Sequence, residues 1–356
     1  MGVRSKGLAF ISLFAIGLAS VASAHAEQRF DGVVLRVATF GGSNKDVLDA
    51  AVSPKFAALG GKIEWVTGSP QSNLAKLIAA RGKAPFDTME ILDAQLPDFA
   101  ASDFLAPLDL EKIPNKQYLE DWQYDGKTMA TWLTQETICY NTEKFKELGL
   151  PAPTTYKDLA VPALAGRTVI PDITSGGGLA NFGGIVYAAG GDLRNVTPGL
   201  ELIKSLKVLK FWSQGGETVT QFGSGDIYAA VVHAGWCVRA KNAGSPVQTV
   251  HPYINAEHTG VHKYGRQGVM KSSENYEAAL WYINEYLSIE TQTALAVKTG
   301  VFPTNKAVIA RLGDDPTLKQ MLELDPAKIS KQLRVDYTDV SISDWVDQWN
   351  RSVVTN

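Results

Sequence analysis

The chain has 356 residues, of which 20% are charged, and its 34 Lys and Arg nearly balance its 37 Asp and Glu. Because the basic residues are scattered, the sequence disfavours a nucleic-acid partner, which requires a concentrated cationic face. The length predicts two domains or two interlaced lobes, each with a core of its own.

The first 26 residues have the order of a secretory signal peptide. Arg4 and Lys6 precede an apolar stretch over residues 8–21, and Ala24-His25-Ala26 fits the small-residue cleavage rule. The apolar stretch is shorter than the roughly 20 residues of a membrane helix, although a retained signal anchor is the alternative. We therefore expect residues 1–26 to be removed on export to the periplasm, so that Glu27 begins the mature protein.

From residue 33 onward, strand-like and helix-like segments alternate. Apolar runs predict strands at 33–40, 62–66, 86–92, 137–140, 167–170, 217–221, 231–235 and 247–250. Helical spacing of apolar residues predicts helices at 45–59, 74–80 (capped by Ser72 or Asn73), 96–101, 142–148, 179–189, 198–212, 276–287 and 291–297. Repeated strand–helix–strand units indicate an α/β fold with mainly parallel strands. The lack of a flexible linker indicates two interlaced lobes joined by short crossing strands.

The sequence contains two cysteines, Cys139 and Cys237, each in a strand-like run. An oxidising compartment permits them to pair, but a disulfide requires Cα atoms within about 7 Å of each other. The sequence leaves open a structural disulfide and two buried free thiols.

Several short motifs follow one another in a fixed order. They are Phe40-Gly41-Gly42, Phe86-Asp87, Phe104-Leu105-Ala106-Pro107-Leu108-Asp109, Ile113-Pro114-Asn115, Ile138-Cys139-Tyr140-Asn141-Thr142, Phe222-Gly223-Ser224-Gly225-Asp226, Ala278-Ala279-Leu280-Trp281-Tyr282-Ile283-Asn284 and Gly300-Val301-Phe302-Pro303-Thr304-Asn305. In this order and spacing they resemble the extracellular solute-binding proteins of ABC transporters, of the spermidine/putrescine-binding type.

The resemblance implies a type II periplasmic-binding-protein fold, with the ligand in a cleft between two lobes. Residues 27–132 and 260–310 would form lobe 1, and residues 133–259 and 311–356 would form lobe 2. It also implies a monomer that closes about its hinge on a small-molecule ligand and docks on an ABC permease in the inner membrane. A sensor subunit that presents its ligand to a membrane receptor would look the same in sequence.

Candidate ligand contacts lie where predicted strands end, since parallel α/β sheets bind ligands beyond the carboxyl ends of their strands. The predicted contacts are Gly42, Ser43, Ser69, Asp93, Thr134, Gln135, Ser175, Gly176, His233, Trp236 and Glu257. Thr174-Ser175-Gly176-Gly177-Gly178 precedes a predicted helix, so its N–H groups are suited to a carboxylate; a flexible loop is the alternative. Of the aromatic residues near these loops, Trp236 is the strongest candidate for a wall of the site, because the resemblance places it at a ligand-contacting strand end.

The ligand class follows from one departure from the family pattern. Polyamine binders of the family carry an acidic residue just after the Gly of that strand, whereas Gly235 is followed here by Trp236. Asp93, Glu136 and Glu257 are suited to one amine, but the other end of the site offers hydroxyls and glycines. We therefore expect a small zwitterionic or carboxylate-bearing ligand, such as an amino acid derivative or an opine-like conjugate. A polyamine is the alternative.

The sequence contains no recognisable catalytic set. His251, His258 and His262 cluster with Glu257, but they lack the H-E-x-x-H spacing of a zinc site. Nucleophile-elbow, phosphate-loop and dinucleotide-binding motifs do not occur. We therefore expect no enzyme activity, no cofactor and no metal.

Overall fold

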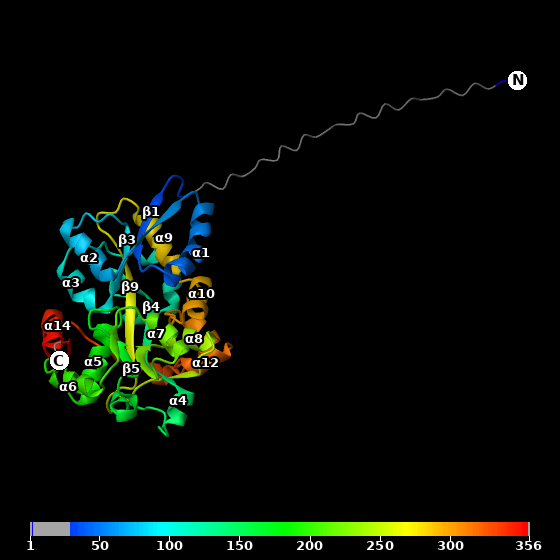
Figure 1. Ribbon diagram of the computed structural model, residues 1–356. Coiled ribbons are helices and arrows are strands. Elements are labelled where there is room, and N and C mark those ends of the chain that lie inside the picture. Colours follow the sequence, from blue (N-terminus) through cyan, green and yellow to red (C-terminus); the bar gives the residue numbers. More distant parts are fainter. Residues whose placement is uncertain (1, 3–28, 355–356) are drawn as a thin grey trace.

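The computed structural model describes Gly2 and residues 29–354. The predicted signal peptide, apart from Gly2, lies outside the described residues. The described chain forms two α/β lobes that share one sheet, and Figure 1 shows β9 running from one lobe into the other. Within the described residues, no helix is long and apolar enough to cross a membrane.

Ten strands of the described chain form a continuous sheet. They are β1 (Val34–Thr39), β2 (Lys62–Thr67), β3 (Thr88–Leu92), β4 (Thr128–Asn141), β5 (Thr168–Pro171), β6 (Lys210–Trp212), β7 (Ala229–His233), β8 (Val247–Val250), β9 (Val261–Val269) and β10 (Leu333–Arg334). Their order is β2-β1-β3-β9-β4-β7-β5-β6, with β10 paired to β9 and β8 paired to β4. The two long central strands, β4 and β9, connect the lobes.

Strand directions bring the functional ends of the two lobes together. β9 runs antiparallel to both β3 and β4, whereas β7 runs antiparallel to β4. The parallel sets β1–β3 and β5–β7 therefore point their carboxyl ends toward each other. β3 ends at Leu92, opposite Gly265, and β7 ends at His233, opposite Glu136. We call the region between these two ends the lobe junction.

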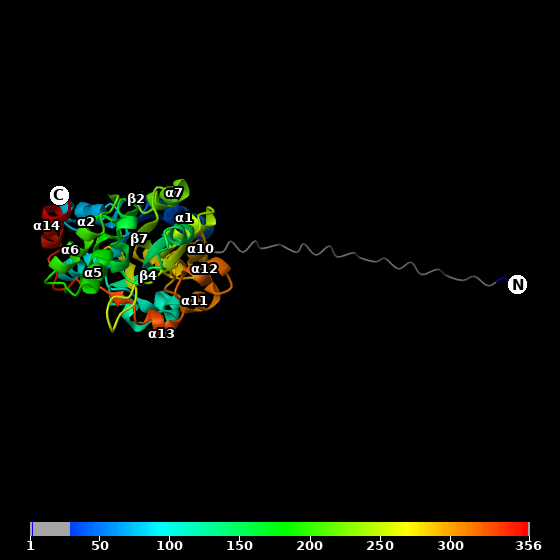
Figure 2. The same ribbon diagram turned by 60° about the horizontal axis from the view of Figure 1, so that its bottom comes forward.

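Helices cover both faces of the sheet. They are α1 (Ser43–Ala58), α2 (Pro70–Ala79), α3 (Leu96–Ala101), α4 (Thr142–Glu147), α5 (Gly178–Ala189), α6 (Thr197–Ser205), α7 (Glu217–Ser224), α8 (Ala234–Asn242), α9 (Tyr276–Tyr286), α10 (Ile289–Thr299), α11 (Lys306–Leu312), α12 (Pro316–Met321), α13 (Pro326–Ile329) and α14 (Ile342–Trp349). The C-terminal α14 lies beside α5 and α6 (Figure 2), where Trp345 and Trp349 pack edge-on against Phe182.

Each lobe has its own apolar core. In lobe 1, Leu35, Phe56 and Tyr282 belong to one buried cluster. In lobe 2, two clusters form, and the second of them joins Cys139 with Phe302, Val308 and other residues that follow α10. The chain after Thr299 thus packs partly with lobe 2, and the exact lobe limits remain a prediction.

Two of the predicted elements have a different secondary structure in the described chain. The helix expected over 198–212 ends at Ser205, because Lys207 adopts a left-handed backbone (φ 47°) and the chain then pairs with β5 as β6. The strand expected over 217–221 is the start of α7, in which Thr218 and Phe222 are buried four residues apart. The N-cap of α2 is Ser69, followed by Pro70, rather than Ser72 or Asn73.

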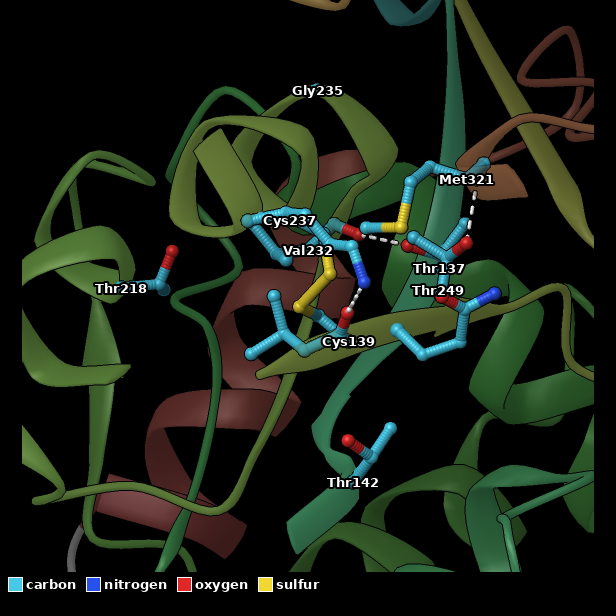
Figure 3. Close-up of a disulfide and its surroundings, with 12 residues drawn as sticks. Thr137, Cys139, Thr142, Thr218, Val232, Gly235, Cys237, Thr249 and Met321 are labelled. Carbon is cyan, nitrogen blue, oxygen red and sulfur yellow. Dashed lines mark hydrogen bonds between the residues drawn. A yellow bond between two sulfur atoms is a disulfide. The ribbon is translucent and has the colours of Figure 1, made fainter. Parts of the chain in front are cut away.

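A disulfide joins Cys139 of β4 to Cys237 of α8, with Cα atoms 5.7 Å apart (Figure 3). The sequence places both cysteines in strand-like runs, but β7 ends at His233 and Cys237 lies on the helix that follows. Both cysteines are fully buried. The bond therefore fixes α8, and with it the end of β7, against a crossing strand.

Candidate ligand-binding site

Polar side chains gather at the lobe junction on one face of the crossing strands. Trp132, Thr134 and Glu136 alternate along β4, and Lys263 lies on β9 directly opposite Thr134. Directly opposite residues of an antiparallel pair share a face of the sheet. These four side chains therefore form one row, and all four residues are buried.

Glu136 is a fully buried carboxylate with two hydrogen-bond donors. The Thr134 hydroxyl donates to its Oε1 at 2.6 Å, and Nδ2 of Asn181 on α5 donates to its Oε2 at 2.6 Å. A Cβ on Gly177 would lie 3.6 Å from Oε2 and 3.2 Å from the ring of Trp212, so the loop before α5 approaches this carboxylate closely. Glu136 is thus held in place between β4 and that loop.

Lys263 is the single lysine of this row. Its Nζ donates to the carbonyl oxygen of Gly176 at 2.9 Å and lies 3.9 Å from Oε1 of Glu136. The same Nζ lies 5.4 Å from the centroid of the Trp132 ring, within the range of a cation–π contact. The ammonium group therefore has an aromatic face, a carboxylate and a carbonyl around it.

Glu90 of β3 holds Trp132 in position. Its carboxylate accepts hydrogen bonds from the Thr39 hydroxyl at 2.7 Å, from the Phe40 N–H at 3.3 Å and from the Trp132 indole. Burial raises the pKa of Glu90, and these donors oppose that rise. The Trp132 ring lies directly over Gly265, where a Cβ would collide with it. Glu90 thus already accepts three hydrogen bonds from the protein itself.

Asp93 follows β3 and has capacity to spare. It accepts a hydrogen bond from the Ala94 N–H at 2.8 Å and a longer one from the Tyr264 N–H at 3.4 Å. Burial raises the pKa of Asp93 to about 7, although the nearby Lys263 charge lowers it. The buried Tyr337 hydroxyl, whose pKa is raised by burial and then by the Asp93 charge, has no hydrogen-bond partner among the described residues.

The loop between β5 and α5 offers hydrogen-bond donors. The Ser175 hydroxyl is buried without a partner in the described part of the chain. For residues 29–354, no hydrogen bond from the N–H groups of Gly176 and Gly177 is formed. A Cβ on Gly176 would meet nothing within 4 Å, so space is open in front of it. These groups precede α5, whose amino end carries partial positive charge.

His233 and Trp236 lie at the start of α8. His233 caps the helix by accepting the Gly235 N–H at 3.1 Å, and burial lowers its pKa well below the usual value. Trp236 packs against Gly215, and the Arg239 guanidinium stacks on its ring at 4.0 Å. The Trp236 ring therefore packs against Gly215 and Arg239, both in lobe 2, and the residue is partly exposed.

The structure brings together only part of the predicted contacts. The polar residues described above at the lobe junction form the junction cluster. It includes four of the predicted contacts, Asp93, Thr134, Ser175 and Gly176, and His233 lies at its edge in lobe 2. Gly42, Ser43 and Ser69 are exposed residues at the starts of α1 and α2, after β1 and β2. Gln135 faces the other side of the sheet, where its amide bonds to the backbone of Glu323. Glu257 lies in an exposed loop between β8 and β9.

The predicted contacts do not include Glu90, Trp132, Asn181 and Lys263, although the structure places all four residues at the lobe junction. Glu136 is expected from the sequence only as one of three carboxylates suited to an amine. Trp212 and Phe222 are core residues, and Tyr187 borders a hollow elsewhere in lobe 2.

Other polar features lie apart from the junction cluster. In the described residues, no group of three or more His, Cys, Asp or Glu is arranged to hold a metal ion. One surface hollow of about 280 Å³ is lined by residues that include Asp192 and Asp336. Another of about 350 Å³ is lined by residues that include Arg81 and Lys271. No residue of the junction cluster lines either hollow.

Two α/β lobes joined by crossing strands are the architecture that the sequence predicts for a solute-binding protein. The model of the bacterial extracellular solute-binding protein family matches residues 51–322, so the chain belongs to that family. It is therefore a solute-binding component of an ABC transporter, which binds a small ligand and partners with membrane permease components. Family membership places it in the periplasm or outside the cell.

Solved structures agree with this fold. An ABC transporter protein from Clostridium perfringens is 25% identical, with a TM-score of 0.70, over 89% of this chain and 99% of that one. A putative spermidine/putrescine ABC transporter protein from Listeria monocytogenes is 18% identical, with a TM-score of 0.72, over 88% and 97% of the two chains. A periplasmic binding protein from A. tumefaciens R10 in complex with agropinic acid is 19% identical, with a TM-score of 0.65, over 91% and 97%.

These similarities confirm the predicted two-lobed α/β fold. They extend the similarity beyond polyamine binders, because one of these structures is a complex with agropinic acid. No curated protein sequence matches the chain.

Proposed function

We propose that this protein captures a small zwitterionic ligand, an amino acid derivative or an opine-like conjugate, at the lobe junction. It acts as a monomer in the periplasm and presents the ligand to the permease of an ABC importer. The observation that carries this proposal is the juxtaposition, at one junction, of a buried carboxyl group with free capacity and a loop of unpaired donors.

The cationic end of the ligand is assigned to Asp93. A buried carboxylate without a matching cation is costly, so it favours a ligand that brings one. From the described residues, Asp93 accepts hydrogen bonds from two backbone N–H groups, one of them at 3.4 Å. An ammonium group supplies the strong, charge-assisted donors that this carboxylate lacks.

The anionic end of the ligand is assigned to the loop of Ser175, Gly176 and Gly177. A carboxylate there receives the Ser175 hydroxyl and two backbone N–H groups, at the positive end of the twelve-residue α5. Lys263 donates to the carbonyl of this same loop, and its charge adds to the positive potential there.

Hinge closure is the proposed mechanism. Ligand groups that contact Asp93 from lobe 1 and the Ser175–Gly177 loop from lobe 2 stabilise the closed form over the open one. The crossing strands β4 and β9 are the segments about which the lobes turn.

A polyamine is the second candidate. Among the described residues, the junction holds three carboxyl groups, Glu90, Asp93 and Glu136, against the single ammonium group of Lys263. This excess of acidic groups favours a polycation, and the similar protein from Listeria monocytogenes is described as a putative spermidine/putrescine transporter.

A thermal-shift screen tests the proposal. The protein is unfolded and refolded to remove carried ligand, and is then heated with amino acids, agropinic acid, dicarboxylates, putrescine and spermidine. Ligand at 100 times its Kd adds about 2.7 kcal/mol of stability, which raises Tm by a few degrees. A zwitterion should give the largest shift. A shift with diamines alone or dicarboxylates alone contradicts the proposed ligand class.

A further inference from the structure

The groups around the Lys263 ammonium group are of the kinds that hold the ammonium group of a ligand, rather than the single carboxylate of a structural ion pair. Its Nζ faces the Trp132 ring at 5.4 Å, the Glu136 carboxylate at 3.9 Å and the Gly176 carbonyl at 2.9 Å. An aromatic face with a carboxylate and a carbonyl is a general solution for holding an alkylammonium ion. Only 9% of the side chain is exposed.

The three carboxyl groups of the junction are not equally available. Glu90 is committed to Thr39, Phe40 and the Trp132 indole. Glu136 has Thr134 and Asn181 as donors and Lys263 as its cation. Asp93 alone is left for a cation from outside.

We infer that Lys263 sets the ligand class of the site. Its ammonium group fills one of two cation positions, so the site accepts a ligand with one ammonium group and rejects a diamine. This inference rests on the proposed function, in that the junction is taken as the ligand site. If Lys263 fills one cation position, the excess of acidic groups no longer favours a polyamine, because the protein itself supplies one of the two cations.

Shortening Lys263 tests this inference through a gain of binding. Lys263→Ala vacates the position beside Trp132 and frees Glu136, so a second ligand ammonium group has a place. The probes are 1,3-diaminopropane, putrescine and cadaverine, titrated by calorimetry into the refolded protein. We expect at least one diamine to bind Lys263→Ala tenfold or more tighter than it binds the wild type. A merely structural role of Lys263 predicts no such gain.

Three variants complete the test. Lys263→Arg keeps a cation at the position and should reject diamines as the wild type does. Lys204→Ala removes an exposed lysine of α6 that pairs with Glu201, and it should also leave diamine binding unchanged. If Lys263→Ala does not fold, Lys263→Thr replaces it, because a β-branched residue suits a strand.

The outcomes separate this inference from the proposed function. The inference is overturned if the shortened variants bind diamines no better than the wild type, or if the wild type binds a diamine as tightly as its best zwitterion. The proposed ligand class is judged separately, by the wild type and the zwitterions. A wild type that binds a zwitterion, with no gain in the variants, removes only the role of Lys263. A gain in the variants without any zwitterion binding removes only the proposed ligand class.

Discussion

Gly235 at the start of α8 and Gly300 after α10 meet backbone to backbone. A Cβ on Gly300 would collide with the Cα of Gly235, and a Cβ on Gly235 would lie 2.6 Å from the carbonyl oxygen of Thr299. The chain after Gly300 then pairs with β4 through Phe302 and Leu133, so it adds a third connection beside the crossing strands. This contact sets the distance between α8 and that connection.

We expect Gly300→Ala to destabilise the protein. Gly300 has a φ of 66°, which alanine adopts at a cost of about 1–2 kcal/mol, and the collision with Gly235 adds to it. Urea unfolding should show a loss of about 1–3 kcal/mol in the free energy of unfolding. Gly223→Ala is the matched control, because Gly223 is exposed in α7 with nothing within 4 Å of a Cβ. That change should be neutral or stabilise by up to about 1 kcal/mol. Equal effects at the two positions contradict the account.

Asp93 gives the stability a pH dependence. Because its folded pKa of about 7 is raised above the unfolded value near 3.9, its contribution is fully present below pH 3.9 and is lost as pH rises through 7. Asp93→Asn cannot ionise, so it does not lose this contribution. As the pH rises from 4 to 7.5, the free energy of unfolding of the variant should therefore increase relative to that of the ligand-free wild type. Each pKa unit corresponds to about 1.4 kcal/mol. Urea unfolding at both pH values measures this, and a difference that does not change with pH counts against a raised pKa.

The opposite sign is expected for the buried histidines on the other face of the crossing strands. Burial lowers the pKa of His262 to about 3 and that of His251 to about 4. Below the unfolded pKa near 6.5, the unfolded chain takes up protons that the folded chain does not. The free energy of unfolding therefore decreases as the pH is lowered. Between pH 7.5 and pH 5.5, His262→Gln should lose about 1 kcal/mol less stability than the wild type. His258→Gln, in the loop between β8 and β9, is the control. The idea fails if His262→Gln keeps the wild-type slope.

The disulfide contributes to stability through the unfolded chain. Cys139 and Cys237 are 98 residues apart, and closing a loop of that length corresponds to about 4–5 kcal/mol in the chain-entropy model. Reduction with dithiothreitol should therefore lower the urea midpoint clearly. A Cys139→Ser, Cys237→Ser double variant should start from the lower midpoint and should not respond to dithiothreitol. An unchanged wild-type midpoint after complete reduction contradicts this contribution.

The fold was largely predictable because its parallel strands are apolar and its helices carry clear spacing. Strand β9 was not, since Val261–Val269 contains Lys263, Arg266 and Gln267, which are typical of a loop. Its polar residues are buried only because partners from distant segments meet them, as Asp125 and the Trp122 carbonyl meet Arg266. The local sequence of a strand does not predict which distant residues will pair with its polar side chains.

The candidate site could be predicted from the sequence only where its residues follow strand ends. Asp93, Ser175 and Gly176 follow predicted strands, and the rule for parallel sheets locates them. Glu90, Trp132 and Lys263 lie within strands, where their inward direction depends on register between segments more than 100 residues apart. The side chain of Trp236 depends on the start of α8 at Ala234, which brings its ring against Gly215 and Arg239, and no strand pattern predicts that contact.

The most direct measurement is a crystal structure of the protein with the zwitterion that gives the largest thermal shift. We expect the ligand ammonium group to lie within about 3 Å of the Asp93 carboxylate. We also expect the ligand carboxylate to accept hydrogen bonds from Ser175, Gly176 and Gly177. A ligand in either surface hollow, or one at the junction that touches neither Asp93 nor this loop, would contradict it.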